Sequence, residues 1–123
     1  MAGRTCLLLA VALLAGAARA TPLRLVAVEP PLEPSAGPDY HLEGAPPPAV
    51  GALLLVTRPQ RLAAGLLHVP VAVVRVIHVE GSRAVARLDH PVERSGAPFL
   101  EVPAPMVGDE ATPWAPTARL ALP

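Results

Sequence analysis

The chain has 123 residues, and its ten basic and ten acidic side chains give a formal net charge of zero. All ten basic residues are arginine, and eight of them lie from Thr21 onwards together with the ten acidic residues. The chain therefore has no basic stripe of the kind that binds nucleic acid or anionic lipid.

Residues 1–20 have the organisation of a signal peptide. Arg4 supplies a positive charge, residues 6–18 are uncharged, and Ala18-Arg19-Ala20 has the small-x-small pattern that precedes a cleavage site. A membrane helix needs about 20 apolar residues, and the uncharged run is shorter than that. We expect cleavage before Thr21 and a mature chain, without a transmembrane span, in the periplasm or outside the cell; an uncleaved anchor is the alternative.

The only cysteine, Cys6, lies within this expected signal peptide. The mature chain would therefore enter an oxidising compartment without a thiol from which to form a disulfide.

Residues 21–39 are interpreted as a proline-rich N-terminal arm. Residues 23–28 alternate only loosely between apolar and polar, so they form either a short strand or part of an extended arm. The prolines at 30–34 and 46–48 favour polyproline-like or irregular backbone. We interpret these stretches as solvated spacers, with a Pro-rich ligand motif as the alternative. Between them, residues 40–44 are expected to form a short strand that ends in a turn.

The next predicted strand lies between Gly51 and Pro59. Leu53-Leu54-Leu55-Val56 is apolar on both sides of the pleat, which indicates a strand within a covered sheet, and Pro59 is expected to end it. Leucine also favours helix, but the segment is too short for an ordinary helix. A crossover over residues 60–67, with one helical turn at 61–64, is expected to follow.

The most regular stretch is 69–91, where Pro70 and Pro91 bracket twenty residues without proline. Valine, isoleucine and alanine dominate it, and Gly81-Ser82 lies in its middle. This pattern predicts a β-hairpin whose loop is Gly81-Ser82 or another loop of even length centred there.

The even loop sets the register of this hairpin. On the expected inner face it pairs Val79 with Ala84, Ile77 with Ala86, Arg75 with Leu88, and Val73 with His90. On the outer face it pairs Glu80 with Arg83, His78 with Val85, Val76 with Arg87, and Val74 with Asp89. A three-residue loop would set Ile77 opposite Arg87 and break the apolar face, so the even loop is preferred.

Prolines interrupt the chain again after the hairpin. Residues 92–95 are expected to be a polar link, and 99–102 and 106–107 are short apolar pieces. Residues 111–123 are interpreted as a flexible C-terminal tail, with Trp114 alone among small residues.

No pattern in the sequence predicts catalysis or a metal site. The four histidines lack the i, i+4 or paired-cysteine spacing of zinc ligands, and the serines lie in expected turns. Asp89, Asp109 and Glu110 are isolated carboxylates, which are expected to be solvated corner residues. We therefore expect a protein that is not an enzyme and has no cofactor.

Arg75 breaks the apolar pattern of the expected inner face, where it lies beside His90. One interpretation is that its side chain snorkels at the rim of the sheet. The other is that Arg75 and His90 mark a binding mouth for an anionic group.

The order of these elements carries a resemblance to known proteins. The residues concerned are Tyr40-x-Leu42-x-Gly44, Val50-Gly51-x-Leu53-x-Leu55-Val56-x-Arg58, Val69-Pro70-x-Ala72, Val73-Val74-x-Val76-x-x-Val79, Ala84-Val85-Ala86-Arg87 and Met106-Val107-Gly108-Asp109. Over roughly residues 40–110, this pattern resembles small β-barrel modules at the C-terminus of bacterial envelope proteins, including LysM-containing peptidoglycan-binding proteins and a flagellar-assembly accessory protein. The resemblance implies a five- or six-stranded SH3-like barrel without catalytic residues. In such modules the Gly-Asp corner leads into a last apolar strand, whereas here residues 110–113 follow as Glu-Ala-Thr-Pro.

The sequence thus predicts an all-β protein, with a small five- to six-stranded SH3-like barrel over residues 40–110 and Pro-rich extended segments on either side. The expected function is that of an exported envelope module, an adaptor or an assembly and structural interaction domain, whose partner is an envelope protein or a cell-wall assembly. The alternative is a small secreted ligand-binding or inhibitor-like barrel that uses Arg75 and His90 at its mouth.

Overall fold

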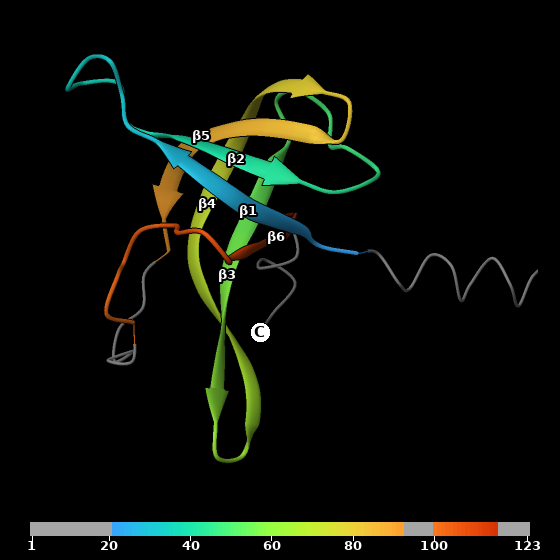
Figure 1. Cartoon of the computed structure of the whole chain (residues 1–123), viewed down its shortest axis with the longest axis vertical. Coiled ribbons are helices and arrows are strands. Elements are labelled where there is room, and N and C mark those ends of the chain that lie inside the picture. The colour runs from blue at the N-terminus through green and yellow to red at the C-terminus, as the bar shows by residue number, and fades with distance from the viewer. Residues whose placement is uncertain (1–20, 93–99, 116–123) are drawn as a thin grey trace, which may run out of the picture.

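Six antiparallel strands make up the regular secondary structure of the part of the chain that the structure describes. This structure, a computed structural model, describes residues 21–92 and 100–115 (Figure 1). The strands are β1 (Leu23–Glu29), β2 (Asp39–Glu43), β3 (Leu53–Leu62), β4 (Gly65–Glu80), β5 (Arg83–Pro91) and β6 (Glu110–Pro113). They form one sheet that closes into a ring in the order β1-β2-β5-β4-β3-β6. The all-β prediction is confirmed.

Within the described ranges, no helix has the length and apolar character needed to cross a membrane. The expected signal peptide lies outside these ranges.

The core is a cluster of apolar side chains to which every strand contributes. Alternate residues of a strand point to opposite faces, and this alternation supplies the core except where the ladder is irregular, as at Val71 and Ala72. Tyr40 is the one aromatic residue of the cluster, and its burial raises the pKa of its hydroxyl. The buried members are Leu23, Leu25, Tyr40, Leu42, Leu54, Val56, Val71, Ala72, Val74, Val76, Ala84, Ala86 and Ala111. The interior of the ring is therefore filled with side chains.

Two strands lie outside the limits expected for the barrel, residues 40 and 110. β1 falls in the expected N-terminal arm, yet Leu23 and Leu25 are buried in the core. β6 falls largely in the expected tail and pairs with both β1 and β3. The physical reason is closure, because without these two strands β2 and β3 would be open edges. The segment Glu110–Pro113 thus closes the ring between β1 and β3.

The predicted hairpin is present as β4 and β5, with Gly81 and Ser82 as its loop. Gly81 has a φ of +62°, which a type II′ turn requires at the first loop position and which glycine adopts readily. The predicted pairs of His78 with Val85 and of Val73 with His90 are both found.

Between these pairs the register differs from the prediction because each strand carries a β-bulge. Ile77 is the extra residue of β4 and Asp89 that of β5, so Val76 pairs with Ala86 and Arg75 with Arg87. One extra residue on each strand cancels the shift, and the predicted register returns at Val73.

The bulges correct the predicted inner face. Val76 and Val74 point into the core, whereas Ile77, Arg75 and Leu88 lie on the outer face and are exposed. The prediction of Arg75 as an inner-face residue is therefore wrong, because the bulge at Ile77 inverts the predicted alternation of the residues that precede it in β4.

The segment after Pro59 is also different from the prediction. β3 runs through Pro59 to Leu62 and pairs with the first residues of β4, so residues 57–70 form a two-stranded ribbon instead of a crossover with a helical turn. Figure 1 shows this ribbon projecting from the rest of the molecule. β6 pairs with β3 only as far as Thr57, which leaves a free edge where proline is tolerated.

Candidate functional site

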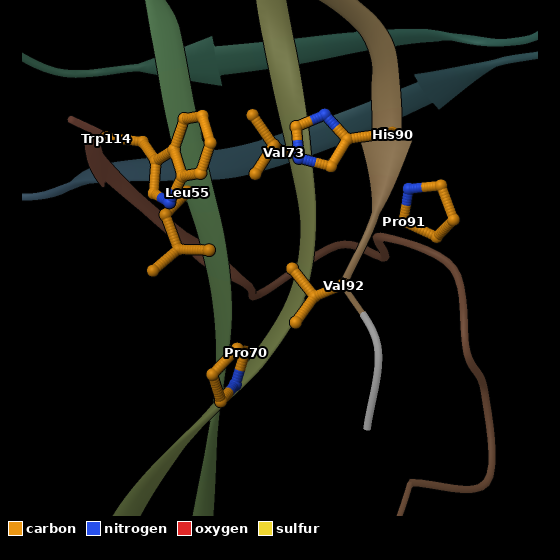
Figure 2. Close-up of a pocket in the computed structure, with 7 residues that line it drawn as sticks. All are labelled: Leu55, Pro70, Val73, His90, Pro91, Val92 and Trp114. Carbon is orange, nitrogen blue, oxygen red and sulfur yellow. The ribbon is translucent and has the colours of Figure 1, made fainter. Parts of the chain in front are cut away.

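A notch on the outer side of the sheet is a concave site to which three strands contribute. It has a volume of about 430 Å³ and lies where β3, β4 and β5 meet the residue after β6. Figure 2 shows its lining residues, which are Leu55, Pro70, Val73, His90, Pro91, Val92 and Trp114. The lining side chains are apolar except for those of His90 and Trp114, whose rings carry nitrogen atoms.

Trp114 and His90 form the polar side of this notch. Their rings meet edge to face, with centroids 5.3 Å apart and planes inclined by 66°. The Trp114 amide donates a hydrogen bond to the Leu53 carbonyl at 3.0 Å, and its side chain is half-buried. Trp114 is thus held against the sheet and is not part of a free tail, because β6 brings it there.

Asp89 joins the two residues that the sequence proposed as a binding mouth. Arg75 donates from Nη2 to Asp89 Oδ1 at 3.0 Å, and His90 Nδ1 lies 2.7 Å from Asp89 Oδ2. The Arg75 guanidinium also reaches the Gly51 carbonyl at 3.3 Å. Arg75 and His90 therefore share one carboxylate on the outer face, but only His90 lines the notch.

The environment of Asp89 favours its charged form. The hydrogen bond from His90, together with the Arg75 guanidinium, holds the pKa of the Asp89 carboxyl below its usual value of 3.8. Because Asp89 already neutralises Arg75, an anionic ligand at this place would have to compete with a fixed carboxylate. The sequence analysis missed this role of Asp89, although its position next to His90 was a signal for it.

This arrangement suits binding better than chemistry. Among the lining residues only His90 has a side chain that can exchange a proton as a general acid or base, and none carries a hydroxyl or thiol that it could activate. The notch can accept a small apolar or ring-shaped group and offer it one imidazole nitrogen.

The second polar cluster is buried, and the sequence analysis did not foresee it. Arg58 donates from Nε to Asp109 Oδ1 at 2.8 Å and from Nη2 to Oδ2 at 2.9 Å. The two residues are only 8% and 1% exposed. The expectation that Asp109 is a solvated corner residue is wrong, because the chain before β6 folds over it.

This cluster also fixes the loop that precedes β6. Arg58 donates from Nη1 to the Val102 carbonyl at 2.5 Å and from Nη2 to the Ala104 carbonyl at 2.7 Å. The Met106 amide donates to Asp109 Oδ2 at 2.9 Å. Since every charged atom has a partner, the pair is a structural tie and not a reactive site. The sequence could have drawn attention to Arg58 and Asp109, because both belong to the pattern that resembles the envelope modules.

No cluster of three or more His, Cys, Asp or Glu side chains suited to a metal ion occurs among residues 21–92 and 100–115. In comparisons with known proteins, no family model, no curated protein and no solved structure matches this chain.

Proposed function

We propose that this chain is an exported, non-enzymatic envelope module, an adaptor or structural interaction domain whose ring of strands is an SH3-like barrel between Pro-rich segments. One observation carries the proposal. The residues that resemble the envelope modules are the ones that build this ring: Tyr40, Leu42 and Val56 lie in its core, and Arg58 binds Asp109. These residues have structural roles, which suits a module that acts by presenting its surface.

The notch is the surface on which we place a protein partner. Trp114 and the surrounding prolines form a depression in which Trp114 is half-buried, and tryptophan is among the residues that contribute most to the energy of protein interfaces. An envelope protein or a cell-wall assembly is the proposed partner.

Export is tested by the N-terminus of the protein recovered from an envelope fraction. The pattern at residues 18–20 predicts that it begins at Thr21. Recovery of chains that still begin at Met1 would contradict cleavage.

The adaptor role is tested by photo-crosslinking in intact cells. A crosslinking residue placed at Val92, on the rim of the notch, should capture an identified envelope-assembly protein, and Trp114→Ala should reduce that product at least about tenfold. The matched control is the same probe at Leu32, an exposed apolar residue away from the notch. Identical products at both positions, or none at Val92, would count against the proposal.

A second function is supported by the volume of the notch and by its polar side. A compact ligand with a ring or an anionic group would contact His90, and Arg75 through displacement of Asp89. For this function His90→Ala and Arg75→Ala should each weaken ligand binding while the melting temperature changes little. If both variants bind like the wild type, the notch is not a ligand mouth.

A further inference from the structure

The end of the ribbon formed by β3 and β4 is unusually apolar for an exposed loop. Every residue from 61 to 68 is exposed, and residues 62–67 read Leu-Ala-Ala-Gly-Leu-Leu. Leu62, Leu66 and Leu67 are 46%, 53% and 42% exposed. We call residues 61–68 the ribbon tip. Its leucines contribute nothing to the core, so their exposure has no explanation in the folding of this chain.

The apolar side chains of the ribbon tip project from both of its faces. Leu62 pairs with Gly65, which puts Leu62 and Leu67 on one face, whereas Leu66 pairs with Arg61 on the other. Figure 1 shows that the tip extends well beyond the ring, and at its base His68 lies 3.5 Å from Glu110 of β6. A flat partner surface would cover one face and leave the other in water.

Charge is distributed along the ribbon in a way that suits a phosphate-bearing surface. In the sequence, no acidic residue occurs between Glu43 and Glu80, a span that includes the whole ribbon, and the carboxylate of Glu110 approaches the ribbon at its base, beside His68. The side chain of Arg61 makes no ion pair or hydrogen bond with the rest of the described chain, in contrast to those of Arg58 and Arg75, which each bind a carboxylate. Arg61 lies two residues before the apex, about 7 Å along a strand.

The small size of the tip favours a lipid surface over a protein as its partner. A stable protein interface takes roughly 20–30 residues from each side, and the ribbon tip offers eight. A lipid surface needs no complementary shape and surrounds an inserted apolar tip on all sides. Interfacial segments typically enter it by about 5–10 Å, the depth at which Arg61 would meet the headgroup phosphates.

We propose that the ribbon tip inserts into the surface of a lipid bilayer, with Leu62, Leu66 and Leu67 among the acyl chains and Arg61 at the phosphates. The insertion is reversible and weak, since even a myristoyl chain gives a partition coefficient of only about 10⁴ M⁻¹. It rests on the ribbon alone and is independent of the function proposed for the notch.

Vesicle flotation tests this proposal, with the processed protein purified from the export compartment. The protein should float with vesicles of phosphatidylcholine, and about fivefold more strongly when phosphatidylglycerol is added, since one arginine faces the anionic surface. Exchanging both Leu66 and Leu67 for serine should lower the partition coefficient at least about tenfold. The matched control is Leu32→Ser, which removes an exposed leucine elsewhere and should float like the wild type.

A fluorescent label on the tip provides a second measurement. The mature chain lacks cysteine, so Ala64→Cys can carry an environment-sensitive dye at the apex, and Ser35→Cys carries it at a remote loop. On addition of vesicles the emission of the Ala64 label should shift to the blue and that of the Ser35 label should not.

Three results would overturn the proposal: no flotation with either kind of vesicle, equal flotation of the double serine variant, or an unshifted label on floating protein. The tip would instead be a contact between copies if the double variant changed the oligomeric state in light scattering without changing flotation.

Discussion

Arg58 and Asp109, which lie 51 residues apart in the sequence, form a buried two-bond ion pair that joins β3 to the residue immediately before β6. The neighbouring backbone adds to this tie, because the Leu25 amide donates to the Asp109 carbonyl at 2.8 Å and the Gly108 amide donates to the Leu25 carbonyl at 2.9 Å. Three strands of the ring therefore meet at Asp109.

Asp109→Ala should be among the most destabilising substitutions in the chain. It leaves the Arg58 guanidinium buried without a counter-charge, which typically costs about 3–5 kcal/mol of unfolding free energy. Urea unfolding of the variant measures this cost. Asp39→Ala is the control, because the pair of Asp39 with Arg87 is largely exposed and should contribute no more than about 1 kcal/mol.

Such a loss approaches the total stability of a small domain, so a second variant is needed. Exchanging Arg58 for methionine and Asp109 for leucine together removes both charges and should restore part of the stability, but not all of it, because the Val102 and Ala104 carbonyls lose their donor. If Asp109→Ala cost no more than Asp39→Ala, the buried tie would not stabilise the ring.

The bulge at Ile77 predicts opposite effects for neighbouring residues of β4. Val76→Thr places an unpaired hydroxyl in the core and should cost about 1–3 kcal/mol, whereas Ile77→Thr on the outer face should cost less than about 1 kcal/mol. On β5, Ala86→Leu should overpack the core by about 1–3 kcal/mol, and Val85→Thr should have little effect. Thermal and urea unfolding measure all four; the reverse order within either pair would mean that the strand faces are assigned wrongly.

Gly44 is required where the turn after β2 meets β1. A Cβ at this position would lie 2.6 Å from Leu23 Cδ2 and 3.3 Å from Leu23 Cα, and its φ is +155°. Gly44→Ala should therefore destabilise the fold by about 1–3 kcal/mol, through both overpacking and backbone strain. Gly37→Ala separates the two effects, because Gly37 has a φ of +63° but open space around it. If Gly44→Ala and Gly37→Ala lowered the free energy of unfolding equally, the contact with Leu23 would not contribute to the effect.

The pKa of the Asp89 carboxyl should depend more on His90 than on Arg75. Its pKa is held below 3.8 in the folded chain, so its contribution to stability is fully present above that pH and is lost as the pH falls through the lowered pKa. His90→Ala should raise this pKa towards 3.8, and Arg75→Ala should raise it less, since the hydrogen bond from His90 is the largest cause. Carboxyl carbon chemical shifts followed by NMR against pH measure both changes. A larger rise in the Arg75 variant would contradict the geometry of this cluster.

The turns and strands that depend only on neighbouring residues could be predicted from the sequence. Gly81-Ser82 between two valine-rich runs predicted the hairpin and its loop, because turn conformation and the two-residue period of a strand are local properties. Tyr40 and Leu42 were placed on a short strand for the same reason, and the prolines predicted the irregular backbone between β1 and β2.

The tertiary structure decided which face each of these residues occupies. The bulge at Ile77 places Arg75 on the outer face, and the bulge at Asp89 restores the predicted register at Val73. The pairing of Arg58 with Asp109 likewise depends on the meeting of β1, β3 and β6. Sequence patterns report interactions over a few residues, whereas closure of the ring brings together residues that are tens of positions apart. Closure places Trp114 against His90, and the same arrangement of strands leaves the ribbon tip exposed.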